Sequence, residues 1–212
     1  MDNSSCRAQP VLKPAPGEVW RRIVGAQKAL AGDAPNVQVA THNVGNIQVG
    51  HTNLGHFGFG FLGAQEDPTT GEVWPSAIFP ANSAKNHLYI AALWIGAVVG
   101  RDTLVTIGAD DGFVVHEWWP GTKDGIVQRS NNPKSRFYDP QALSEQDIIA
   151  TYYDTLTDVG TTAQDPIDGR PHKPLNLKVV ERSLQWSYDY ASDFVLFDFL
   201  ITNIGSRKLE KV

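Results

Sequence analysis

The sequence predicts an all-β protein, mainly an antiparallel β-sandwich, with one short helix. Two observations carry this prediction. Apolar and polar residues alternate with a period of two over much of 36–63 and 175–203, as in strands with one buried face. Among the 212 residues there are 19 Gly and 6 Trp, and charged residues make up only 19%. That composition is more typical of β-sheet proteins than of helical ones.

The first 35 residues differ from the rest of the chain. They are rich in Pro and Ala, with prolines at positions 10, 14, 16 and 35. This composition is typical of a leader or linker. From residue 36 onward, alternating residues are repeatedly interrupted by Gly. We therefore expect a leader or linker over 1–35 and one β-rich sandwich domain over 36–212.

The middle of the chain predicts a hairpin followed by a long loop. The apolar run LYIAALWIGAVV (88–99) indicates a strand that is buried on both faces, and RDTLVTIGADDG (101–112) alternates as its partner. A tight turn at Gly100–Asp102 would join them. The stretch FVVHEWWPG (113–121) predicts a further strand, and the polar residues of 120–143 predict a loop.

The single predicted helix starts near Ser144. This serine can cap a first turn, and Asp147 follows three residues later, which is a variant of the capping box. β-Branched and aromatic residues then follow in LSEQDIIATYYDTL (143–156), and these lower helix propensity. The pattern therefore predicts a short helix near 145–153 that runs into a strand.

Two strands close the chain, over 175–190 and 193–203. The second is apolar on both faces, which predicts a central strand rather than an edge strand. The cluster Asn203–Ser206 predicts a turn, after which Leu209 and Val212 begin a return strand. Because that return strand is so short, we expect the domain to be incomplete at its C-terminus and to belong to a larger polypeptide.

The composition argues against several kinds of partner. The net charge is −5 and basic residues form no run, whereas nucleic-acid binding needs concentrated Lys and Arg. The one cysteine, Cys6, cannot form an internal disulfide. No apolar window is long enough to span a membrane. We therefore expect no nucleic acid and no transmembrane segment, and no cofactor unless calcium is bound.

Glu117, Trp118 and Trp119 form the strongest candidate binding motif. Neighbouring tryptophans in a strand point to opposite faces, so at most one joins the core easily. An exposed indole can stack on a sugar ring, and a nearby carboxylate can accept hydrogen bonds from its hydroxyls. Trp74 and Trp186 could extend this platform. The alternative is that these tryptophans fill a β-sheet core.

Asp165 and Asp168, in the loop DPIDG, are candidate calcium ligands, because Ca²⁺ takes about six to eight oxygen atoms. The loop lacks the EF-hand pattern, and Asp-Gly is also a common turn dipeptide. His42, His51 and His56 match no metal motif, so we assign them structural roles.

The sequence points to no catalytic group. No serine lies in a Gly-x-Ser-x-Gly setting, and the cysteine has no evident histidine partner. Paired carboxylates for glycoside cleavage stay open, because any Asp or Glu pair could converge in space. The sequence therefore leans against an enzyme without deciding the question.

Three stretches together resemble the N-terminal region of large, uncharacterised bacterial exported proteins that often carry a C-terminal sorting domain. They are LYIAALWIGAVVGRDTLVTIG, LSEQDIIATYYDT and VERSLQWSYDYASDFVLFDFLITNIGSRKLEKV, and the similarity covers roughly residues 40–212. The last stretch also resembles a strand–turn–strand unit of immunoglobulin-like repeats in bacterial surface proteins. The resemblance implies an extracellular or cell-surface location, and it supplies no catalytic residues.

These observations favour a non-catalytic structural or adhesive module of an exported bacterial surface protein, with polysaccharide or another surface protein as its partner. One alternative is a β-sandwich that binds or processes carbohydrate through its tryptophans. Another is an accessory module of a secreted peptidase.

Overall fold

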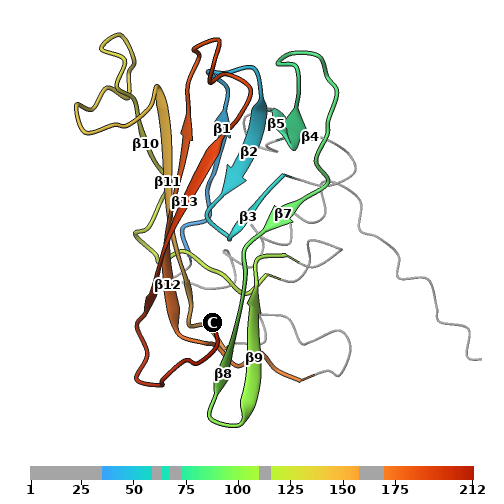
Figure 1. The fold of residues 1–212 in the computed structure, drawn as a ribbon, viewed down its shortest axis with the longest axis vertical. Coiled ribbons are helices and arrows are strands. Elements are labelled where there is room, and N and C mark those ends of the chain that lie inside the picture. Colours follow the sequence, from blue (N-terminus) through green and yellow to red (C-terminus); the bar gives the residue numbers. More distant parts are fainter. Residues whose placement is uncertain (1–34, 59–63, 67–72, 110–115, 158–169) are drawn as a thin grey trace, which may run out of the picture.

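The computed structural model describes residues 35–58, 64–66, 73–109, 116–157 and 170–212. Within these ranges the protein consists of antiparallel β-sheets and contains no helix (Figure 1). The prediction of an all-β, mainly antiparallel fold is therefore confirmed. Residues 1–34, predicted as a leader or linker, lie outside the described part of the chain. Within the described part, no helix is long and apolar enough to cross a membrane.

The longest strands of the described residues lie in a four-stranded sheet with the order β10-β11-β12-β13. Its strands are β10 (Val127–Arg129), β11 (Gln146–Asp154), β12 (Leu177–Gln185) and β13 (Leu196–Asn203). Burial alternates along β11 and β12, with every second side chain on the covered face. The long antiparallel register between these two strands gives the sheet its stable centre.

A second sheet has the order β1-β2-β3-β7, and β6 also pairs with β2. The strands are short: β1 (Val39–His42), β2 (Gln48–Thr52), β3 (His56–Phe57), β6 (Ala77–Ile78) and β7 (Ala91–Ala92). β4 (Ala64–Glu66) and β5 (Val73–Pro75) form a separate pair. β8 (Trp94–Val99) and β9 (Asp102–Ile107) form the predicted hairpin, with Gly100 at a φ of 66° in the tight turn.

The covered face of the four-stranded sheet packs against two different neighbours. At one end, His42 of β1 and His51 of β2 contact Ser183 of β12. At the other end, Ile95 and Ala97 of β8 join the main apolar cluster. The other buried members of this cluster are Trp118, Ala150, Tyr152, Leu175, Leu177 and Val179. Figure 1 shows β1, β2 and β8 lying against this sheet.

The predicted helix near 145–153 is wrong, because these residues form strand β11. One capping contact is present, because the Ser144 N–H donates to Asp147 over 2.8 Å. The Ser144 hydroxyl also donates to the Asp147 carboxylate, over 2.5 Å. They close a turn, and the chain then continues extended. Ile148, Ala150 and Tyr152 are fully buried while the residues between them face outward, so the period of two outweighs the local start signal.

The prediction that residues 193–203 form a central strand is also not met. Among the residues that the structure describes, β13 pairs only with β12 and is an edge of the four-stranded sheet. Phe197 and Phe199 face the covered side, where Phe197 stacks on Phe57 and Phe199 packs against the apolar cluster. Leu196 and Leu200 face outward and are 49% and 63% exposed. The apolar residues of β13 therefore form one face that neighbouring side chains cover and one face that is exposed to solvent.

The residues after β13 do not return alongside it. Asn203 stabilises the predicted turn, because its side chain accepts a hydrogen bond from the Gly205 N–H and donates one to the Arg207 carbonyl. Glu210 then forms a two-way backbone bridge with Val98 of β8. The end of the described chain thus connects the four-stranded sheet to the β8–β9 hairpin.

Candidate functional site

The predicted sugar-stacking residues Trp118 and Trp119 are both buried, with exposed fractions of 0% and 3%. Trp118 packs edge-on against Tyr152 in the main cluster, and its indole N–H donates to the Leu93 carbonyl over 3.1 Å. Trp119 lies in a second cluster with Leu54. The segment runs between two apolar clusters, so both faces are covered, and neither indole has an exposed face for a sugar. Of the additional tryptophans, Trp74 is buried as well.

Glu117 is part of a buried charge cluster around His172. One Glu117 oxygen lies 2.8 Å from His172 Nδ1, and the other accepts a hydrogen bond from the Ile107 N–H over 2.8 Å. Asp154 Oδ1 lies 2.5 Å from His172 Nε2. Asp154 Oδ2 accepts hydrogen bonds from the Thr106 hydroxyl and the Leu175 N–H. The cluster therefore connects β9, β11 and the segment before β12.

The two carboxylates keep the imidazole protonated. Burial alone would lower the pKa of His172, but Asp154 and then Glu117 outweigh it and raise the pKa from 6.5 to about 9. Both ring nitrogens are occupied, and the His172 side chain is only 2% exposed. A histidine in this state has no free nitrogen to take a proton from a substrate, so the cluster is suited to holding segments together rather than to acid–base chemistry.

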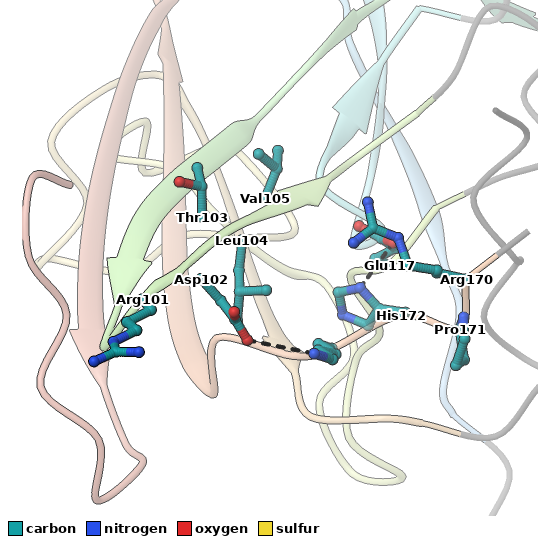
Figure 2. A pocket seen from close by; sticks show the side chains of 10 residues that line it. Arg101, Asp102, Thr103, Leu104, Val105, Glu117, Arg170, Pro171 and His172 are labelled. Carbon is teal, nitrogen blue, oxygen red and sulfur yellow. Dashed lines mark hydrogen bonds and ion pairs between the residues drawn. The ribbon is translucent and has the colours of Figure 1, made fainter. Parts of the chain in front are cut away.

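This charge cluster forms one wall of a cavity of about 420 Å³, drawn in Figure 2. Residues 101–105 of the β8–β9 turn and β9 line one side, and residues 170–173 line the other. Lys173 and Asp102, which both line the cavity, form an exposed ion pair with 3.4 Å between Nζ and Oδ2. The other residues predicted as ligands, Asp165 and Asp168, lie outside the described part of the chain.

A second buried polar network joins the two main sheets. Ser183 Oγ lies 2.6 Å from His42 Nε2 and 3.0 Å from His51 Nδ1. Beyond His51, Glu181 lies 3.3 Å from its Nε2 and accepts a hydrogen bond from the Tyr152 hydroxyl over 2.7 Å. Burial, and after it Glu181, raises the pKa of Tyr152, so the phenol stays protonated. Burial lowers the pKa of His42 to about 3, so this imidazole is neutral.

His56 and His116 form a further buried pair, with ring centroids 6.5 Å apart. Burial lowers their pKa values to about 4 and about 3. Within the described part of the chain, no three or more His, Cys, Asp or Glu side chains gather in a way that could hold a metal ion. Both ring nitrogens of His116 lack a hydrogen-bond partner among the described residues. The structural role of His42, His51 and His56 stays a prediction.

Several exposed aromatic side chains gather in the loop between β12 and β13. Tyr188, Tyr190 and Phe194 are 45%, 85% and 47% exposed, and Trp186 is half-buried. Tyr188 and Tyr190 stack on each other with ring centroids 5.6 Å apart. The ring centroids of Trp186 and Phe194 lie 6.1 Å apart, with the two rings tilted. We call these four residues the aromatic loop surface. Among them, Trp186 was the residue that the sequence suggested for a sugar platform.

The loop that carries these rings is held firmly at several points. The Ser187 N–H and hydroxyl both donate to Glu145, over 2.6 and 2.7 Å. The Asn46 side chain donates to Asp193 over 2.9 Å, and its N–H donates to the Ser192 carbonyl over 2.8 Å. In Figure 1 the β12–β13 loop and the β1–β2 loop meet at the top of the molecule. The aromatic loop surface is therefore presented by a fixed backbone.

Sequence reasoning missed this surface because it assigned residues 175–190 to a strand and considered only Trp186 of this surface as an exposed ring. Four aromatic residues within nine positions of a turn were a usable signal, because turns lie on the surface and cannot bury all of them. Comparison with protein-family models, with curated proteins and with solved structures finds no significant match. The function must therefore be argued from these sites alone.

Proposed function

We propose that this chain is a non-catalytic, adhesive β-sandwich module of an exported bacterial surface protein, and that it binds polysaccharide through the aromatic loop surface. The observation that carries the proposal is the exposure of Tyr188 and Tyr190 on an anchored loop. Tyrosine offers a sugar both an apolar ring face and a hydroxyl that can form hydrogen bonds. The supporting features are the arrangement of the rings, the polar groups beside them and the rigidity of the loop.

Each of the two tyrosine rings keeps one face turned away from its partner. The ring planes of Tyr188 and Tyr190 are within 18° of parallel and the rings stack, so the two outer faces point in opposite directions. Large exposed aromatic side chains lose little entropy on binding, because they have only two rotatable side-chain bonds. A sugar ring could stack on the outer face of Tyr190, which is 85% exposed.

Polar groups suited to sugar hydroxyls lie beside the rings. Asp189 sits between the two tyrosines in sequence and is exposed, and the exposed Asp193 already accepts a hydrogen bond from Asn46. A binding site of this kind combines an apolar face with a few fixed polar groups that orient the ligand. Acidic side chains here would favour neutral polysaccharides over anionic ones, because two carboxylates repel further negative charge.

The proposal leaves chemistry out because two of the buried polar clusters are held by internal contacts. His172 is held by two carboxylates, and His42 shares Ser183 with His51. The fixed loop also favours binding, since a preorganised surface pays less entropy when a ligand is ordered on it. An extracellular or cell-surface location remains part of this proposal and rests on the sequence resemblance.

The test is binding of neutral glycans to the wild-type chain and to single variants. We expect xylan or a β-glucan to bind with a change in tryptophan fluorescence, because Trp186 belongs to the surface. Tyr190→Ala should weaken that binding about tenfold, which corresponds to about 1.4 kcal/mol. Tyr138→Ala is the matched control, because Tyr138 is 51% exposed but lies on the β10–β11 connection.

Two outcomes would reject the proposal. In the first, no glycan on a broad array binds the wild-type chain at millimolar concentration. In the second, a glycan binds, but Tyr188→Ala and Tyr190→Ala retain full affinity, which would place the site elsewhere. Circular dichroism of each variant separates loss of binding from loss of fold.

A further inference from the structure

We propose that the free edge of β9 is a docking site for one extended, acidic peptide segment, which would add to the β8–β9 hairpin as a third strand. The site is the cavity of Figure 2, and we call it the β9 groove. It is separate from the aromatic loop surface, and the proposal does not depend on the polysaccharide hypothesis. Three features of the groove support an extended peptide: the direction of the backbone groups on β9, the shape of the groove and the charges around it.

Hairpin geometry fixes which backbone groups point away from β8. The pairing of Val99 with Asp102 encloses a two-residue turn, so this pair is hydrogen-bonded and the next pair, Val98 with Thr103, is not. Residues with outward groups on β9 are therefore Thr103, Val105 and Ile107. The same rule places the outward groups of β8 at Val98, and Val98 does form its outward backbone bridge there with Glu210.

One of the outward positions on β9 is already used. Ile107 donates its N–H to the Glu117 carboxylate over 2.8 Å, and its carbonyl accepts the Glu117 N–H over 2.9 Å. In the part of the chain that the structure describes, Thr103 and Val105 have no comparable partner outside the hairpin. Unpaired edge groups of this kind are a ready template for another strand.

The shape of the groove fits such a strand. Five consecutive residues, 101–105, line one side of it. Because side chains of a strand alternate between faces, consecutive residues can line one cavity only where it follows the edge of the strand. Figure 2 shows Thr103 and Val105 along β9, with Pro171 and His172 on the other side. The volume of about 420 Å³ is in the usual range for binding clefts.

The charges around the groove select an acidic occupant. Arg101 and Lys173 bring positive charge to it, whereas Asp102 is its exposed carboxylate and Glu117 is already held by His172. The Lys173–Asp102 pair is 61% exposed on both sides, and such a pair holds its partners only weakly. The surplus of positive charge stands out because the whole chain carries −5. Exposed Val105 would pair with a β-branched side chain of the incoming strand.

The experiment uses the full chain and a defined probe, acetyl-Val-Glu-Val-Glu-Val-Glu-Val-amide. A second peptide carries Lys in place of each Glu, and a third carries N-methyl groups that remove alternate backbone donors. We expect the acidic peptide to bind at least about tenfold more tightly than either of the others. Hydrogen exchange should show the Thr103 and Val105 amides becoming protected only with the acidic peptide.

Matched variants locate the site. Val105→Pro removes one outward N–H without disturbing the bonds to β8, and Val105→Thr keeps that N–H on a similar side chain. We expect the proline variant to lose at least about tenfold in affinity and the threonine variant to retain it. Lys173→Glu should weaken binding of the acidic peptide, whereas Lys134→Glu, an equal charge change at an exposed distant site, should not.

Each contrary result overturns the proposal. Equal binding of the N-methylated peptide would mean simple ionic attraction, and equal binding of the lysine peptide would mean that charge does not select the occupant. Absence of binding by the acidic peptide at millimolar concentration would also reject it. Self-association that Val105→Pro abolishes would show that a second copy of the chain occupies the edge instead.

Discussion

His172 Nε2 lies 2.5 Å from Asp154 Oδ1, inside a site where the Asp154 side chain is fully buried. This contact joins the segment before β12 to the end of β11, and Glu117 extends it toward β9. Buried carboxylates are costly unless they are paired. The folded state of this region therefore depends on the charge of one imidazole, and this dependence can be tested directly.

Removing that imidazole should destabilise the protein strongly. We expect His172→Gln to lower the free energy of unfolding by roughly 3–5 kcal/mol, because it leaves Asp154 and Glu117 without their shared cation. Denaturant unfolding measures this change. His87→Gln is the control, because His87 is exposed, and it should change the stability by less than about 0.5 kcal/mol. Equal effects of the two substitutions would contradict the burial argument.

Stability should also fall as the solution becomes alkaline. The pKa of His172 is raised from 6.5 to about 9, so the folded state binds more protons than the unfolded state between these values. The stabilisation is complete below about pH 6.5 and is lost as the pH rises through about 9. Unfolding measured over this range should show the decline in the wild-type chain and a flatter profile in His172→Gln.

Acid should destabilise the protein through a different set of histidines. Burial lowers the pKa values of His42 and His116 to about 3 and that of His56 to about 4. Below about pH 6.5 these histidines bind protons in the unfolded chain but stay neutral in the folded chain. The free energy of unfolding therefore falls as the pH falls. His116→Phe keeps an aromatic ring beside Trp119 and should reduce this slope. An unchanged slope between pH 6.5 and the lowered pKa values would show that His116 is not buried in its neutral form.

The shared hydroxyl of Ser183 should matter more than an exposed hydroxyl. Ser183→Ala leaves His42 and His51 without their buried partner, which should cost about 1–3 kcal/mol. Ser206→Ala, in the exposed turn after β13, provides the control and should have almost no effect. Thermal and denaturant unfolding of the pair would decide this. A neutral Ser183→Ala variant would mean that water or a neighbour replaces the hydroxyl.

The outward face of β13 should make the chain prone to associate. Leu200 is 63% exposed on an edge strand, and exposed apolar edges favour pairing between molecules. We expect Leu200→Lys to reduce concentration-dependent association, measured by light scattering, with little change in unfolding. Leu143→Lys places the same charge at a residue that is 55% exposed but outside the strands, and it should not have this effect. If both variants behave alike, general charge rather than the β13 edge controls association.

Much of the strand content could be predicted from local patterns. Alternation identified the region of β12, a run of apolar residues identified that of β13, and the short turn at Gly100 identified the β8–β9 hairpin. The helix prediction failed at Ser144 and Asp147 because their hydrogen bonds form equally well at the start of a strand. The candidate site was harder, because burial of Trp118 and Trp119 depends on which segments pack against each ring, and those segments are distant in the sequence.

The amino-acid sequence by itself determined that the chain forms β-strands, since a period of two is a property of neighbouring residues. Only the tertiary structure decided that β13 is an edge, that Trp118 and Trp119 lie inside, and that His172 meets Glu117 from 55 positions away. These are contacts between segments distant in the sequence. Their choice depends on how whole faces fit together and exclude water, and that fit becomes defined only when all the strands are in place.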